Sequence, residues 1–190
     1  AERRRGVLAG VRHVFADSLL ASIVTVALIA HVGLAALFAS LPALAFRDFH
    51  DARSAGVLFT ADAIGSIIGG LAALRLARRY SPLRLGVAGF GLMSAPIWLL
   101  TIATPLPLVV VVMFVFGIGG PLGVAPISAL LTTRAPAEIR PKVVAAFLSI
   151  TSAGTPFGAA LTGYAIAAVG FRTTYGAVAA AMTLSTLLLI

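Results

Sequence analysis

Residues 54–77, SAGVLFTADAIGSIIGGLAALRLA, decide the fold class of this chain. This stretch is about as long as a helix must be to cross a bilayer. Asp62, Gly65, Ser66, Gly69 and Ala73 recur at helical spacing, so they share one face. A stripe of small residues with apolar flanks is typical of a membrane span packed against other spans. Because a carboxylate facing lipid would cost about 2.5–3.5 kcal/mol, we expect Asp62 to face protein or a water-filled cavity.

The composition also indicates a membrane protein. Hydrophobic residues make up 60% of the chain and charged residues 11%, with a mean hydropathy of +1.08, whereas soluble domains carry about 25% charged residues. The chain has no cysteine, which excludes disulfides and cysteine-ligated metals. Its three histidines lie in different segments, so we expect neither a metal site nor another cofactor.

The apolar segments are separated by short connections rich in proline and charge. They predict six spans at about 19–45, 54–77, 84–103, 107–131, 143–168 and 173–190. Residues 1–17 are basic and weakly amphipathic, which predicts a helix on the cytoplasmic membrane surface; a disordered basic linker is the alternative. The chain begins without methionine and stops inside an apolar run, so we expect a fragment. The predicted fold is an all-α membrane protein, a six-transmembrane-helix bundle.

The distribution of basic residues predicts the orientation of the bundle. With a cytoplasmic N-terminus, eleven of the fourteen lysines and arginines lie inside, and only Arg47, Arg53 and Arg172 lie outside. This obeys the positive-inside rule and predicts a multi-pass protein of the cell membrane with both termini in the cytoplasm. The net charge of +8 would suggest nucleic acid in a soluble chain. Here it is explained by cytoplasmic loops beside anionic lipid headgroups of the bilayer, so no nucleic-acid partner is expected.

Two cytoplasmic loops carry the charged residues of most interest. We interpret Arg78 and Arg79 as a membrane anchor, with contacts at a cytoplasmic gate as the alternative. Glu138 and Arg140 are expected to form an exposed ion pair, worth at most about 1 kcal/mol.

Glycines and prolines interrupt the fourth and fifth predicted spans: Gly119, Pro121, Gly123, Pro126, Gly154, Pro156 and Gly158. Glycines four residues apart allow helix backbones to approach closely, and prolines remove backbone donors and kink helices. The pattern therefore predicts close packing with fixed kinks. A compatible alternative is that these helices slide and bend during a conformational cycle.

Two motifs resemble a known family. Residues 123–143, GVAPISALLTTRAPAEIRPKV, are similar to the P-x-E-x-R-G-R-V loop between spans ten and eleven of major facilitator superfamily transporters, in the enterobactin-exporter and macrolide-efflux branch. Residues 156–163, PFGAALTG, are similar to that branch's P-L-G-x-x-L-x-G. The resemblance covers residues 1–190 as spans seven to twelve. The chain departs from the family at Pro141-Lys142, where Gly-Arg is usual, and at Ala73, where the G-x-L-A-D-R loop has aspartate.

The resemblance implies half of a two-lobed major facilitator fold. It implies a secondary transporter that exports a small amphipathic molecule, such as a drug or siderophore, by proton-coupled antiport and alternating access. The partner would be a missing N-terminal six-helix half or a second copy of the chain.

Asp62, His31 and Ser66 are the candidates for contact with the substrate or the coupling ion. Asp62 could carry a proton across the span or pair with a cationic substrate; alternatively its carboxyl is hydrogen-bonded to Ser66 or to a neighbouring helix. His31 lies in the middle of the first span and could relay protons, or it could be a satisfied neutral imidazole. That Asp62 and His31 lie near each other is a hypothesis at this point.

Two other classes of function compete with transport for this sequence. An intramembrane serine protease needs a nucleophilic serine on a glycine-flanked turn and a histidine on a facing helix. Ser66 and His31 are the nearest candidates, and we do not expect an enzyme. A stand-alone six-helix assembly or channel subunit is the main alternative, although a channel would want a ring of repeated polar residues along one span.

Overall fold

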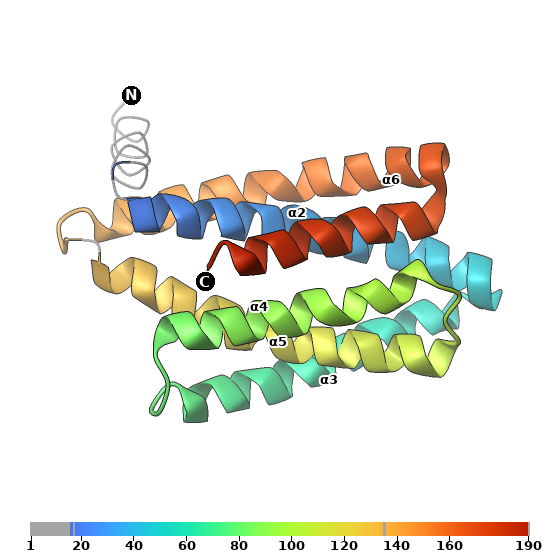
Figure 1. Ribbon diagram of the computed structural model, residues 1–190, viewed down its shortest axis with the longest axis horizontal. Coiled ribbons are helices and arrows are strands. Elements are labelled where there is room, and N and C mark those ends of the chain that lie inside the picture. Colours follow the sequence, from blue (N-terminus) through green and yellow to red (C-terminus); the bar gives the residue numbers. More distant parts are fainter. Residues whose placement is uncertain (1–15, 17, 135, 190) are drawn as a thin grey trace.

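The computed structural model describes residues 16, 18–134 and 136–189, and within them the secondary structure is entirely helical. The predicted lead-in at 1–17 therefore lies outside the described residues except for Ala16. The helices are α2 (Ser18–Phe49), α3 (Arg53–Leu76), α4 (Pro82–Ile97), the short 3₁₀ helix η1 (Trp98–Thr101), α5 (Leu106–Arg134) and α6 (Arg140–Leu187), as Figure 1 shows.

Among the described residues, five helices are long and apolar enough to cross a membrane, where the sequence predicts six spans. The difference lies in α6, whose 48 residues contain one non-helical position, Gly170, with φ 82° and ψ 169°. The chain folds back at this residue (Figure 1), so α6 has a first arm, residues 140–169, and a second arm, residues 171–187. Glycine alone adopts this backbone conformation without strain. The fifth and sixth predicted spans thus correspond to the two arms.

The helices form two groups of three membrane-length segments. In one group, α2 packs against both arms of α6: Gly158 lies against Val32 and Ala35, and Gly33 lies against Met182. In the other group, α5 packs between α3 and α4 (Figure 1). Contacts between α4 and the second arm of α6 join the groups.

These joining contacts include polar bonds. Trp98 Nε1 donates to Thr183 Oγ1 at 3.1 Å. The hydroxyls of Ser94 and Thr186, both buried, lie 3.5 Å apart. Hydroxyl pairs of this kind are a common link between helices where no water is available.

The ends of α2 and α4 follow from local sequence. The helix α2 continues to Phe49, four residues past the predicted end of the first span, so Arg47 and Asp48 lie on the helix instead of in a loop. It ends at His50, whose positive φ of 54° cannot continue a right-handed helix. At the start of α4, the Ser81 hydroxyl accepts a bond from the Arg84 amide at 3.4 Å and Pro82 takes the first helical position.

The connections of the bundle lie at two opposite ends (Figure 1). The α3–α4 and α5–α6 connections share one end, which we call the basic end because it carries Arg75, Arg78, Arg79, Arg84, Arg140 and Lys142. The α2–α3 and α4–α5 connections and the turn at Gly170 share the other, which we call the vestibule end. Between them the outer surface is apolar: Ile67 and Leu74 on α3 are 65% and 72% exposed. Such a surface suits hydrocarbon as the surrounding solvent.

Candidate functional site

Three phenylalanines join α2, α3 and α5 in the half of the bundle nearer the vestibule end. Phe38 of α2 stacks on Phe59 of α3, with ring centroids 5.7 Å apart and an interplanar angle of 23°. Phe38 also meets Phe116 of α5 edge-on, with centroids 6.2 Å apart. Both are favoured arrangements of aromatic rings. We call these three residues the aromatic junction.

All three candidate coupling residues lie on the basic-end side of the aromatic junction. His31 precedes Phe38 by seven residues, so it lies on the same face of α2, about 10 Å closer to the basic end. Asp62 and Ser66 follow Phe59 on α3, which runs toward the basic end. Asp62 is about 4–5 Å beyond Phe59 at 1.5 Å per residue.

Asp62 is partly buried at the contact between α3 and α5. The helix backbones approach closely there: a Cβ atom at Gly117 of α5 would overlap the carbonyl oxygen of Asp62. Within the described part of the chain, the Asp62 carboxylate makes no hydrogen bond and no ion pair. A carboxylate in this environment is open to a proton or a cation.

Ser66 bonds to a neighbouring helix. Its hydroxyl donates to the carbonyl oxygen of Gly117 at 3.3 Å. The hydroxyl therefore contributes to the α3–α5 contact, and the hydrogen bond between Asp62 and Ser66 that the sequence left open is not formed.

His31 borders a small internal cavity of about 30 Å³, with Leu34, Phe90, Val124 and Phe147 among the other lining residues. This volume matches that of one water molecule, and His31 is the one residue with a nitrogen- or oxygen-bearing side chain among the residues that line it. His31 Nδ1 lies 2.9 Å from the carbonyl oxygen of Ala27. If Nδ1 carries the hydrogen and donates to this carbonyl, Nε2 is left as an acceptor.

The structure does not bring Asp62 and His31 into contact. No hydrogen bond or ion pair joins them in the part of the chain that is described. Counted along the helix axes from the Phe38–Phe59 stack, His31 lies about 6 Å closer to the basic end than Asp62 does. Exchange of a proton between them would need a bridging water or a movement of the helices.

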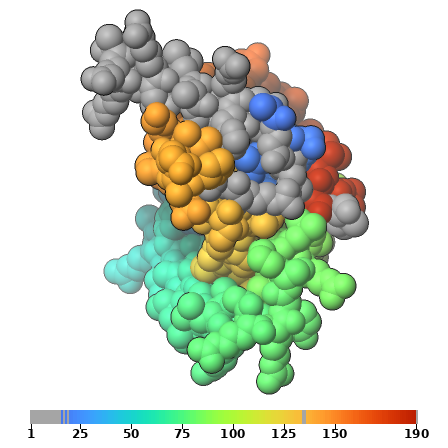
Figure 2. All heavy atoms as spheres, turned by 90° about the vertical axis from the view of Figure 1, so that its left-hand side faces the viewer, coloured from blue at the N-terminus to red at the C-terminus, as the bar shows by residue number. Residues whose placement is uncertain are grey.

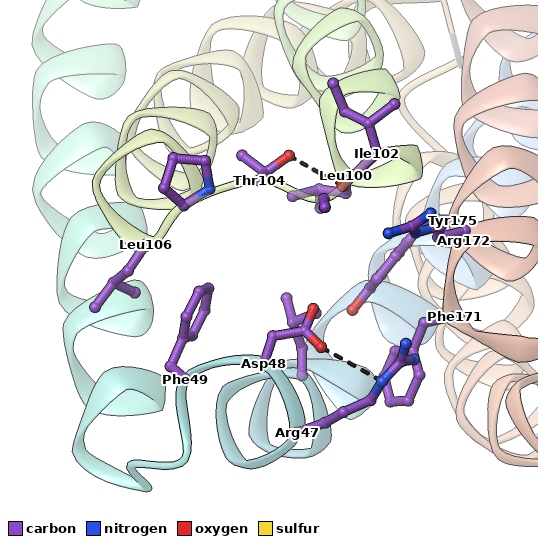
Figure 3. A pocket seen from close by; sticks show the side chains of 13 residues that line it. Arg47, Asp48, Phe49, Leu100, Ile102, Thr104, Leu106, Phe171, Arg172 and Tyr175 are labelled. Carbon is purple, nitrogen blue, oxygen red and sulfur yellow. Dashed lines mark hydrogen bonds and ion pairs between the residues drawn. The ribbon is translucent and has the colours of Figure 1, made fainter.

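A second hollow, of about 510 Å³, opens at the vestibule end (Figure 3). It lies where the end of α2, the α4–α5 connection and the turn at Gly170 meet. Arg47 Nε lies 3.4 Å from Asp48 Oδ1, and the Arg47 guanidinium carbon is 4.8 Å from the centre of the Phe171 ring. The contact between Arg47 and the Phe171 ring ties the end of α2 to the turn of α6.

Closer to the interior of the bundle than this hollow, a buried hydrogen bond also links α2 and the second arm of α6. The Tyr175 hydroxyl donates to Ser40 Oγ at 3.0 Å, and Ser40 donates to the carbonyl oxygen of Leu37 at 2.7 Å. The sequence reasoning missed this hollow because it assigned Arg47 and Asp48 to a loop. One feature of the sequence could have indicated this hollow. An aromatic residue precedes an arginine at both predicted outer boundaries, in Phe46-Arg47 and in Phe171-Arg172.

The glycines predicted to pack lie at helix contacts. Gly119 of α5 faces Gly89 and Met93 of α4, and Gly123 of α5 faces Gly89 and Phe90. Gly154 and Gly158 of α6 face Leu28, Val32 and Ala35 of α2. Pro121, Pro126 and Pro156 all lie within helices that continue past them.

The loop residues are all exposed: Arg78 and Arg79 between α3 and α4, Glu138 in the α5–α6 connection, and Arg140 at the start of α6. The ion pair between Glu138 and Arg140 stays a prediction.

Apolar helices of membrane-spanning length, with apolar outer faces and charged connections, define a multi-pass membrane protein. The chain belongs to the Major Facilitator Superfamily, whose family profile matches residues 23–190. The superfamily is one of membrane transporters, so the chain is assigned to transport and not to enzyme catalysis. The comparison with curated proteins gave no match.

Proposed function

We propose that this chain is one six-helix lobe of a proton-coupled exporter for a small amphipathic molecule. The observation that carries the proposal is the Asp62 carboxylate, partly buried within a membrane span and without a polar partner among the described residues. Ionisable groups in such positions are costly and usually serve transport or proton transfer. The superfamily profile supplies the transporter class.

The proposal includes a second lobe, supplied by a missing N-terminal half or by another copy. In transporters of this kind, two lobes related by an axis along the membrane normal enclose a site near the bilayer midplane. A second lobe is supported by the exposed face of the first arm of α6, which carries Ser149, Ser152, Ala160 and Gly163. Small and hydroxyl-bearing residues are characteristic of helix contacts within membranes.

Asp62 would act as the proton carrier. When the site is open to one side of the membrane, the carboxyl takes up a proton from water, or it releases its proton to water as a cationic substrate binds to the carboxylate. When the lobes rock, the site opens to the other side. His31 with its water-sized cavity would pass protons between this site and the basic end.

The direction of transport and the membrane are also parts of the proposal. Outward transport is supported by the similarity of residues 123–143 and 156–163 to an exporter branch. A cytoplasmic location of the basic end, in the cell membrane, is supported by the excess of arginine there.

The test is dye transport by the complete transporter in everted membrane vesicles, with ethidium as an amphipathic cationic probe. We expect an imposed proton gradient to drive ethidium accumulation, and Asp62→Asn to abolish it. Asp51→Asn is the matched control, because Asp51 is an exposed carboxylate outside the spans. Full gradient-driven transport by the Asp62→Asn protein would contradict the proposal.

A further inference from the structure

The hairpin between α3 and α4 concentrates positive charge at the basic end. Arg75 lies in the last turn of α3, Arg78 and Arg79 lie in the connection, and Arg84 lies in the first turn of α4. All four are exposed, and within the described residues none of them forms an ion pair. Residues 63–137 contain no aspartate or glutamate at all. The hairpin is therefore a patch of uncompensated cations.

This patch is hollowed and partly apolar. Leu74, Arg75, Leu76, Arg78 and Arg79 line an open hollow of about 630 Å³. Leu74 is 72% exposed and lies directly beside the arginines. Apolar and cationic groups thus border one space.

An apolar strip leads from this hollow along α3. Ile67, Leu71 and Leu74 recur at i, i+4 and i+7, so they form one stripe, and they are 65%, 53% and 72% exposed. The stripe points away from the Gly65–Gly69 face that packs on α5. It runs from the middle of the span to the arginines.

We propose that this hollow, the basic hairpin site, binds the headgroup of an anionic phospholipid. The guanidinium groups of Arg78 and Arg79 would donate to the phosphate oxygens, which match the donor geometry of arginine. One acyl chain would lie along the strip from Leu74 to Ile67. Uncompensated arginines at a membrane boundary attract anionic lipids in this way.

The surroundings of the hairpin leave room for a lipid. Figure 2 views the molecule from the basic end, and the green segment around residues 75–84 projects at one edge. The orange start of α6 lies apart from it, on the other side of α5. The hairpin therefore lies apart from the other charged connection of the basic end.

A soluble anion would use the arginines but not the strip. Attraction between arginines and the carbonyl end of α3 explains why basic residues occur there. An exposed Leu74 suits surrounding hydrocarbon, but neither effect alone accounts for an exposed leucine and uncompensated arginines that border one hollow. The combination of both features favours a phospholipid.

The test is native mass spectrometry of the full chain with added dioleoyl-phosphatidylglycerol or dioleoyl-phosphatidylcholine. The test variant is Arg78→Gln/Arg79→Gln, and the matched control is Arg53→Gln/Arg172→Gln at the vestibule end. We expect the unaltered chain to prefer phosphatidylglycerol. The test variant should lose affinity for this lipid by about fivefold per arginine, roughly 25-fold in all. The control should change by less than twofold.

Two further measurements use the unaltered chain, in case the test variant does not fold. Raising the salt from about 0.1 M to about 1 M shortens the screening length severalfold and should weaken phosphatidylglycerol binding. Excess inorganic phosphate should displace little of the lipid, because phosphate lacks an acyl chain for the strip. The proposal is overturned by equal binding of both lipids, by equal losses in the two double variants, by binding insensitive to salt, or by full displacement with phosphate.

Discussion

Phe38 of α2 stacks on Phe59 of α3 at the place where these two helices meet, with ring centroids 5.7 Å apart. Elsewhere α2 packs mainly on α6, and α3 packs mainly on α5. The stack therefore ties together the two groups of helices. Asp62 and His31 both lie on the basic-end side of this stack.

Phe38→Ala should destabilise the bundle because it removes both ring contacts of the junction. Deletion of a well-packed phenylalanine ring costs about 3–5 kcal/mol when it is fully buried, and Phe38 is only partly buried, so we expect about 2 kcal/mol. The measurement is the free energy of unfolding in detergent. The control is Phe157→Ala, since Phe157 is 67% exposed and should cost much less. Equal losses of unfolding free energy in the two variants would mean that the ring contacts of the aromatic junction do not stabilise the bundle.

Adding a methyl group between α3 and α5 should force these helices apart. A Cβ at Gly65 would overlap the carbonyl oxygen of Phe114, and a Cβ at Gly117 would overlap that of Asp62. We expect Gly65→Ala and Gly117→Ala each to cost about 1–3 kcal/mol. Gly56→Ala is the control in the same helix as Gly65, because a Cβ there meets nothing within 4 Å. The same thermal-unfolding midpoint for Gly65→Ala and Gly56→Ala would refute the close approach.

The turn within α6 should depend on glycine at one position. Gly170 has φ 82° and ψ 169°, a conformation that strains other residues by about 1–3 kcal/mol. Gly170→Ala should therefore lower the unfolding temperature, although a Cβ there meets no atom within 4 Å. Gly163→Ala, within the first arm and equally unhindered, should be neutral or stabilising. A raised unfolding temperature for Gly170→Ala together with a lowered one for Gly163→Ala would show that the chain does not fold back at Gly170.

Tyr175→Phe should remove one buried hydrogen bond without emptying space. The Tyr175 hydroxyl donates to Ser40 Oγ at 3.0 Å, and Ser40 keeps its own bond to Leu37. We expect a loss of about 0.5–1.5 kcal/mol in the free energy of unfolding. In a double-mutant cycle with Ser40→Ala the two losses should be less than additive. Strict additivity would show that the two hydroxyls do not interact.

Much of the fold follows from the sequence alone. The length and hydropathy of residues 54–77, and the spacing of Asp62, Gly65 and Gly69, predict a packed membrane helix, and the structure contains α3 over Arg53–Leu76 with Gly65 and Gly69 against α5. These features are local, because hydrocarbon thickness sets span length and helical periodicity sets the packed face.

The features that were missed depend on tertiary structure. The extension of α2 to Phe49 places Arg47 over Phe171, a residue more than a hundred positions away. Similarly, Ser66 could have bonded to Asp62 on its own helix, and only the approach of α5 offers it Gly117.

The most direct test of the account is proton release on substrate binding by the complete transporter in weakly buffered detergent. We expect addition of ethidium to release protons from the unaltered protein, and no protons from Asp62→Asn at matched occupancy of the probe. The Asp51→Asn protein should behave like the unaltered one. Equal proton release from the unaltered and the Asp62→Asn proteins would contradict the claim that Asp62 couples substrate to protons.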